Sequence, residues 1–125
     1  MRKEISNWLK QANRDCEVAE KNFNLKEYYA AAFWAQQAVE KGLKALILEK
    51  TKEKALGHSL VYLGKIASVP ENFISKLKKL SPQYFLARYP DASEDTPFEL
   101  YDSEITKELV EISKEVLGWI NNQLK

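Results

Sequence analysis

The segment from Leu25 to Glu49 (LKEYYAAAFWAQQAVEKGLKALILE) constrains the fold more than any other part of the chain. At 100° per residue, a helix over this segment carries apolar residues on one side, which is typical of a core-facing helix. A second side carries small residues, which allow another backbone to approach closely. The first set is Leu25, Tyr28, Tyr29, Ala32, Val39, Leu43, Leu46 and Ile47, and the second is Ala31, Ala35, Ala38, Gly42 and Ala45.

This helix leaves one narrow polar window, made of Gln37, Glu40, Lys41 and Lys44. A helix that is apolar around most of its circumference belongs at the centre of a bundle, so we expect a site on this window. The alternative is an ordinary exposed ion pair between Glu40 and Lys44, worth about a few tenths of a kcal/mol. Gln36 lies inside the apolar stripe, so its amide needs partners in the core or across an interface.

Helical spacing of apolar residues also predicts helices on both sides of this segment. We expect a helix over residues 4–22, a turn at 22–24, a short helix over 58–67, another from Pro70, and a last helix from residue 102 or 103 to 123. Ile105 belongs to the apolar stripe of the last helix, and Cys16 falls in that of the first, as a small core residue. With no strand signal or repeat, the 125 residues predict one all-α domain, a helical bundle.

Composition and motifs exclude several classes of protein. No apolar run approaches the roughly 20 residues that span a bilayer, and the N-terminus lacks the apolar region of a signal peptide. The single cysteine allows no internal disulfide, so we expect a cytoplasmic protein. One Cys and one His form no metal-binding motif, and no phosphate-binding glycine loop occurs, so we expect neither a metal nor a cofactor.

The charges are unevenly spread although the net charge is only +1. Residues 91–104 hold six acidic residues and no basic one, directly after a basic stretch over residues 76–88. The residues 87–100 before the last helix show no periodicity, and loops of this length are often functional. The acidic residues either suit a loop and a helix N-terminus or form a docking surface for a partner.

Two further features could carry chemistry. His58 is the only histidine and follows Gly57. It either lies at the start of a helix or serves as an acid, a base or a hydrogen-bond donor to phosphate near neutral pH. In the sequence Arg88-Tyr89-Pro90-Asp91, the guanidinium could bind phosphate while Tyr89 stacks on a base. The alternative is that Arg88 pairs with Asp91 and only locks the loop.

Together these motifs resemble the HEPN domain, a family named for nucleotide binding in higher eukaryotes and prokaryotes. The resemblance rests on YYAAAFWAQQAVEKGLKAL (residues 28–46), GHSL (57–60), RYPD (88–91) and a long last helix closed by Trp-Ile (119–120). It implies an up-and-down bundle of four or five helices, usually a homodimer, often encoded beside a minimal nucleotidyltransferase with which it associates. The positions that match family motif residues are Gln37, Glu40, Lys41, Lys44, His58, Arg88 and Tyr89.

Many HEPN proteins are metal-independent ribonucleases, often toxins of toxin–antitoxin pairs, with an Arg and a His four to six residues apart at the dimer interface. This chain lacks that pair, because its arginines are Arg2, Arg14 and Arg88 and none precedes His58 at that distance. We therefore expect a non-enzymatic module that binds a nucleotide, with phosphate held by Lys44 and Arg88, or that binds a nucleotidyltransferase.

Two alternatives remain open. One is a ribonuclease in which folding or dimerisation brings His58 and Arg88 together. The other is a structural adaptor whose acidic residues 91–104 dock a basic partner. The homodimer has some support from composition, since three Trp, six Tyr and five Phe are more than a small bundle readily buries.

Overall fold

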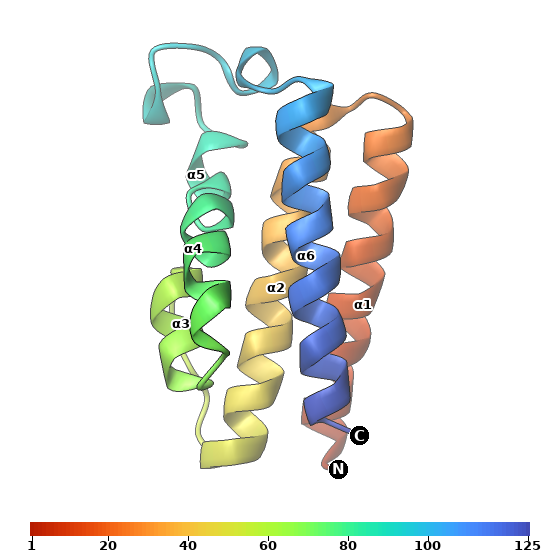
Figure 1. Cartoon of the computed structure of the whole chain (residues 1–125), viewed down its shortest axis with the longest axis vertical. Helices are drawn as coiled ribbons and strands as arrows, with labels where there is room; N and C mark the ends of the chain where they lie inside the picture. The colour runs from red at the N-terminus through yellow and green to blue at the C-terminus, as the bar shows by residue number, and fades with distance from the viewer.

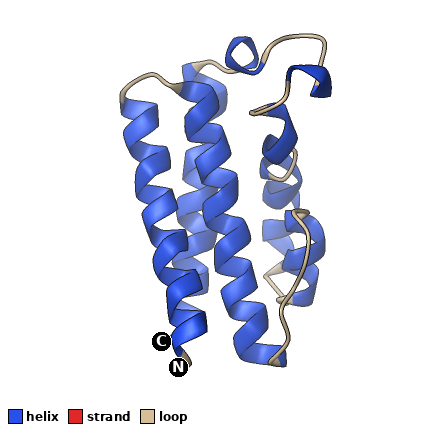
Figure 2. Ribbon diagram, turned by 180° about the vertical axis from the view of Figure 1, so that it is seen from behind, coloured by secondary structure: helices blue, strands red, loops and turns tan.

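The computed structural model describes residues 1–125, which form a bundle of three long helices completed by shorter ones. The long helices are α1 (Lys3–Asn24), α2 (Tyr28–Thr51) and α6 (Ser103–Gln123), and the short ones are α3 (Leu60–Ile66), α4 (Glu71–Leu80) and α5 (Gln83–Leu86). The chain runs up α1, down α2, up through the short helices and down α6, so both termini lie at one end (Figure 1). No strand is present (Figure 2), which confirms the predicted all-α bundle.

Helix α2 is the centre of the bundle, as its sequence predicts. It contacts α1, α6 and each of the short helices. Its small residues do allow close approach: a Cβ added at Gly42 would lie 2.9 Å from Leu117 Cδ1 and 3.1 Å from Ile120 Cδ1, both on α6. The absence of a side chain at Gly42 therefore sets how closely α2 and α6 pack.

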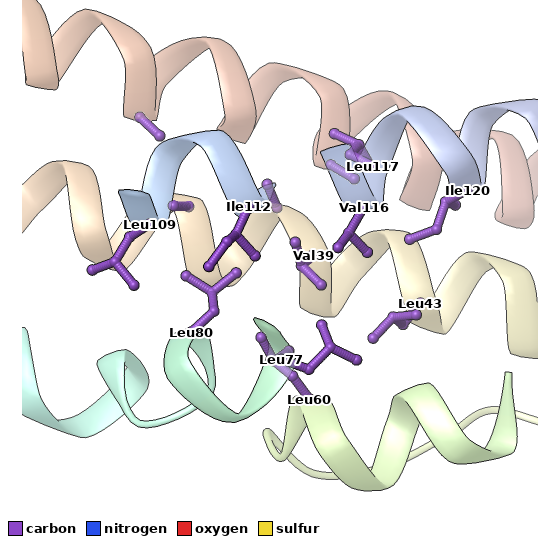
Figure 3. Close-up of a cluster of buried hydrophobic side chains, with 14 of the residues drawn as sticks. Val39, Leu43, Leu60, Leu77, Leu80, Leu109, Ile112, Val116, Leu117 and Ile120 are labelled. Atoms are coloured by element: carbon purple, nitrogen blue, oxygen red, sulfur yellow. The ribbon is translucent and has the colours of Figure 1, made fainter. Parts of the chain in front are cut away.

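The largest part of the core lies between α2, α6 and the short helices (Figure 3). There Val39 and Leu43 of α2 face leucines of α3 and α4 and the apolar stripe of α6. The contributing residues are Leu60, Leu77, Leu80, Leu109, Ile112, Val116, Leu117 and Ile120. Cys16 packs against this core as predicted, and burial raises the pKa of its thiol, which makes it a poor nucleophile.

Three residues predicted to face the core are exposed instead. Leu25 is 73% exposed and lies in the turn between α1 and α2, while Tyr29 and Ile105 lie in the first turns of α2 and α6. Periodicity gives the direction of a side chain but not whether a neighbouring element covers it. At the ends of these helices no neighbour does.

Several predicted boundaries also need correction. Helix α1 continues through the expected turn to Asn24, and α3 begins only at Leu60, because Ser59 caps it by accepting a hydrogen bond from the Tyr62 N–H (3.2 Å). Pro70 precedes α4 instead of opening it. The segment between α5 and α6 contains two 3₁₀ turns, η1 (Pro90–Ala92) and η2 (Pro97–Leu100), each opened by a proline. Helix α6 begins where predicted, with Asp102 as its cap.

Two glycines that differ only in their surroundings give a matched test of the packing. A Cβ at Gly64 of α3 would lie 2.5 Å from Leu77 Cδ1 in the core, whereas one at Gly118 of α6 would contact nothing within 4 Å. We expect Gly64→Ala to lower the free energy of unfolding by about 1–2 kcal/mol through overpacking. Gly118→Ala should raise it by about 0.5–1 kcal/mol, because alanine favours the helix. Urea unfolding measures both, and equal effects would contradict the packing described here.

Candidate functional site

Glu40 of α2 is the centre of a buried polar network. The residue is 5% exposed, and its carboxylate accepts hydrogen bonds from Lys44 Nζ (3.0 Å) and Gln36 Nε2 (3.2 Å). His58 Nδ1 lies 3.1 Å from Oε1 and 3.2 Å from Oε2 of the same carboxylate. A buried carboxylate needs such partners, and here three side chains supply them.

The chain between α2 and α3 brings His58 to this network. Gly57 precedes it with φ 93°, a left-handed conformation that favours glycine. Gln36 Nε2 also donates to the His58 carbonyl oxygen (3.2 Å), so both the backbone and the ring of His58 are bound to α2. Because a carboxylate can only accept, Nδ1 carries the proton in the contact with Glu40. Nε2 is then the ring nitrogen available to a ligand, on a side chain that is 45% exposed.

Tyr84 of α5 connects His58 to Arg88. Its ring stacks on the imidazole with centroids 3.8 Å apart and planes 10° apart. The guanidinium carbon of Arg88 lies 4.9 Å from the same ring, and 5.2 Å and 4.8 Å from the rings of Phe33 and Tyr89. Arg88 Nη2 also donates to Tyr89 Oη (2.7 Å). Folding therefore brings together two residues that are far apart in the sequence.

An open hollow of about 640 Å³, which we call the His58 hollow, lies beside these residues. It is lined by His58, Tyr84, Phe85, Tyr89, Asp91 and Ala92. Its wall is thus mostly aromatic, with one imidazole and one carboxylate.

A second buried carboxylate lies on the face that α1 and α2 share. Asp15 is 2% exposed and accepts hydrogen bonds from Lys41 Nζ (2.5 Å) and Gln11 Nε2 (2.8 Å). The Lys41 ammonium also lies 5.7 Å from the centre of the Trp34 ring. The polar window of α2 is therefore the place where two buried ion pairs form.

Comparison with known proteins identifies the family. The sequence profile of the HEPN domain matches residues 5–123, almost the whole chain. The chain belongs to the HEPN family.

Individual relatives agree with this assignment. Crystal structures of TT1696 from Thermus thermophilus (TM-score 0.87, 30% identity) and of ST0689, an archaeal HEPN homologue (TM-score 0.82, 32% identity), each align over 97% of this chain and 98% of theirs. A Methanocaldococcus jannaschii protein named "Putative toxin MJ1304" is 27% identical, over 94% of this chain and 86% of its own length.

Within this HEPN domain, the predicted site residues divide between separate places. His58 and Tyr89 line one hollow, with Arg88 beside them. Lys44 lines a different hollow next to Trp8, and Lys41 lines a third. Gln37 lines none of these three, and its amide donates to Gln36 Oε1 (2.9 Å). The structure does not bring Lys44 and Arg88 into one hollow.

Two alternatives weighed from the sequence are wrong. The Glu40–Lys44 pair is not on an exposed face, since the two side chains are only 6% and 13% exposed. The Arg88 guanidinium bonds to Tyr89 instead of pairing with Asp91. The structure contains no cluster of three or more His, Cys, Asp or Glu residues that could hold a metal ion. None of its helices has the length and apolar character needed to span a bilayer.

Tyr84 and Asp15 are the residues that the sequence did not single out. Tyr84 lies four positions before Arg88 (one helical turn), which is a usable signal for two side chains on one face. Asp15 offers no comparable signal, because an acid next to an apolar stripe is ordinarily exposed.

Tyr101, directly after η2, connects the end of the segment between α5 and α6 to Gln83 at the start of α5, and it gives a pH prediction. Its hydroxyl donates to Gln83 Oε1, and burial raises the pKa of Tyr101 to about 12. The unfolded chain loses this proton near pH 10, so the free energy of unfolding should fall as pH rises from about 10 to about 12. Urea unfolding across that range should show a shallower fall in Tyr101→Phe than in the exposed control Tyr62→Phe. Equal slopes would contradict the burial of this phenol.

Proposed function

We propose that this HEPN domain binds a nucleotide or RNA, with its phosphate at the His58 hollow. The observation that carries the proposal is the ring of Tyr84, which contacts both the imidazole of His58 and the guanidinium of Arg88. A guanidinium is the preferred partner of phosphate oxygens, and the exposed Nε2 of His58, which has no proton in the neutral ring, can accept a hydrogen bond from a ribose hydroxyl or a base amine.

The surroundings of Arg88 support phosphate binding. The guanidinium has five N–H groups, of which one bonds to Tyr89 Oη, so others remain for a ligand. The centres of three aromatic rings lie within 5.2 Å of its central carbon, and such packing reduces the side-chain entropy lost when a ligand binds.

The remaining wall of the hollow suits the rest of a nucleotide. Phe85 and Tyr89 are more than one-third exposed, and exposed aromatic rings are platforms on which bases stack. Asp91 repels a phosphate but can accept a hydrogen bond from a ribose hydroxyl or a base amine. The phosphate therefore belongs on the Arg88 side of the hollow.

Calorimetric titration with AMP, ATP and a short single-stranded RNA tests this function. We expect the wild type to bind and Arg88→Ala to weaken binding by about tenfold or more, the loss expected for a charge-assisted contact. His58→Ala should weaken it less. Arg14→Ala is the matched control, because Arg14 is an exposed arginine of α1 paired only with Glu17. Identical isotherms for wild type and Arg88→Ala would refute the site.

The proposal extends to assembly as a homodimer and to association with a minimal nucleotidyltransferase. The family resemblance supports both. The large apolar side chains left exposed, among them Leu56, Tyr62, Phe85 and Phe98, are candidates for the contacts of such an assembly. Light scattering at micromolar concentration tests the dimer, and a monomer would refute it. Co-purification with a nucleotidyltransferase encoded beside the gene tests the partner.

A second candidate function, metal-independent RNA cleavage, is favoured by the contact between Glu40 and His58. A carboxylate on Nδ1 fixes the imidazole so that Nε2 can remove a proton from a ribose 2′-hydroxyl. The 2′ oxygen would attack the phosphorus, and the bond from phosphorus to the 5′ oxygen would break as that oxygen takes a proton from water, while Arg88 stabilises the charge. Cleavage of labelled RNA in the presence of a chelator, abolished in His58→Ala, would replace the binding-only function. No cleavage by the wild type would exclude this candidate.

A further inference from the structure

Two hollows meet at Trp8, on the face shared by α1 and α2 and apart from the His58 hollow. The first, which we call the Trp8 hollow, has about 160 Å³ and is lined by Trp8, Lys44, Leu48, Lys54, Ala55 and Leu56. The second, which we call the amide hollow, has about 390 Å³ and is lined by Glu4, Asn7, Trp8, Gln11 and Lys41. An elongated ligand could therefore lie across the indole of Trp8 with one part in each.

The Trp8 hollow is lined by two ammonium groups and no carboxylate. Lys44 has three N–H donors, of which one goes to Glu40 while the ammonium lies 5.9 Å from the centre of the Trp8 ring. Lys54 pairs with Glu4 at 3.2 Å, but both side chains are exposed, so this pair contributes little and exchanges readily for another anion. The charge of the hollow fits an anionic group.

The rest of the Trp8 hollow is apolar. An apolar cavity of about 150 Å³ can hold a benzene ring, so about 160 Å³ fits one side chain of the size of leucine. Leu56 is largely exposed, and a docked aliphatic group would cover it. The lining of the hollow thus combines apolar side chains with two ammonium groups.

The amide hollow continues this site with groups that bind peptide backbone. Asn7 and Gln11 both carry a carbonyl acceptor and N–H donors, and Gln11 uses one N–H on Asp15. Donors and acceptors together match a peptide group, which has one of each.

We propose that this face binds the carboxyl terminus of a partner peptide that ends in an aliphatic residue. The last side chain lies between Trp8, Leu48 and Leu56, and its carboxylate accepts hydrogen bonds from Lys44 and Lys54. The preceding peptide groups cross Trp8 and pair with Asn7 and Gln11. The proposal is independent of nucleotide binding at the His58 hollow.

The probe for the test is the tripeptide acetyl-Ala-Ala-Leu with a free carboxylate, compared with the same peptide as a carboxamide. Proton–nitrogen NMR of the Trp8 indole reports occupancy, and the indoles of Trp34 and Trp119 are internal references. We expect saturation with a dissociation constant of about 1 mM, a typical strength for a ligand of this size. The carboxamide should bind at least about tenfold more weakly. Equal binding of the two peptides, or no movement of the Trp8 signal, would overturn the proposal.

Variants separate the parts of the site. Lys54→Ala changes an exposed side chain and should weaken binding of the carboxylate peptide several-fold. The control Lys10→Met, on the exposed side of α1, should leave this binding unchanged. Asn7→Ala should weaken binding of the tripeptide without affecting binding of 4-methylpentanoate. This acid has the aliphatic group of leucine and a carboxylate but no peptide group. If 4-methylpentanoate binds as tightly as the tripeptide, the ligand is a free aliphatic acid and the peptide proposal is wrong.

Discussion

Replacing Lys41 with methionine should lower the free energy of unfolding by about 3 kcal/mol. Lys41 Nζ lies 2.5 Å from Asp15 Oδ2, and the Asp15 side chain is only 3% exposed. Without the ammonium, a buried carboxylate keeps a single donor, Gln11, and removing one partner of a buried pair typically costs this much. Methionine keeps the side chain except for its terminal ammonium, so the loss reports mainly the charge, including its contact with the Trp34 ring.

The exposed pair between Arg14 and Glu17 is the control, and it lies on α1, the helix that carries Asp15. Arg14→Ala should change the free energy of unfolding by less than about 1 kcal/mol, because exposed pairs contribute little. In the double variant Asp15→Asn with Lys41→Met, the neutral amide should restore part of the loss. Urea unfolding measures all three. Equal losses in Lys41→Met and Arg14→Ala would show that Asp15 is not buried as described.

Replacing Glu40 with alanine should be as damaging, at about 3 kcal/mol. It would leave the Lys44 ammonium without its acceptor and take from the fully buried Gln36 amide one of its two acceptors, and a buried group that loses its partner is costly. Glu49 of the same helix is the control, since it pairs with Lys52 at an exposed position, and Glu49→Ala should cost less than about 1 kcal/mol.

The same substitution has a spectroscopic consequence at His58. Nitrogen NMR of this single histidine should show a proton on Nδ1 in the neutral ring of the wild type, because Nδ1 faces the carboxylate. Glu40→Ala removes the acceptor and should move the proton towards Nε2. An unchanged tautomer would mean that Glu40 stabilises the fold without orienting the imidazole.

The sequence predicts the architecture well because α2 encodes it directly. Its apolar residues, its small residues and Gly42 leave a helix that can only be buried, and the other helices follow from their own periodicity. The exposed Leu25 and Ile105 show the limit of this reasoning. Whether a residue at a helix end is covered depends on where the neighbouring helices stop, and their lengths are not encoded in that residue.

The candidate site is only partly predictable for a related reason. The sequence identifies His58, Arg88 and Glu40 as residues able to do chemistry, but not which of them meet. Tyr84 brings His58 and Arg88 together, and Asp15 engages Lys41, through contacts between elements that are distant in the sequence. The division of the predicted set into separate hollows follows from these contacts.

The carboxylate of Glu40 contacts both Lys44, which lines the Trp8 hollow, and His58, which lines the His58 hollow. An anion that draws Lys44 away would leave the carboxylate with Gln36 and His58 as its remaining partners. The shared carboxylate therefore predicts a coupling between the two proposed sites, so that a ligand bound in one hollow should change the affinity of the other. Linkage requires the effect to be equal in the opposite direction.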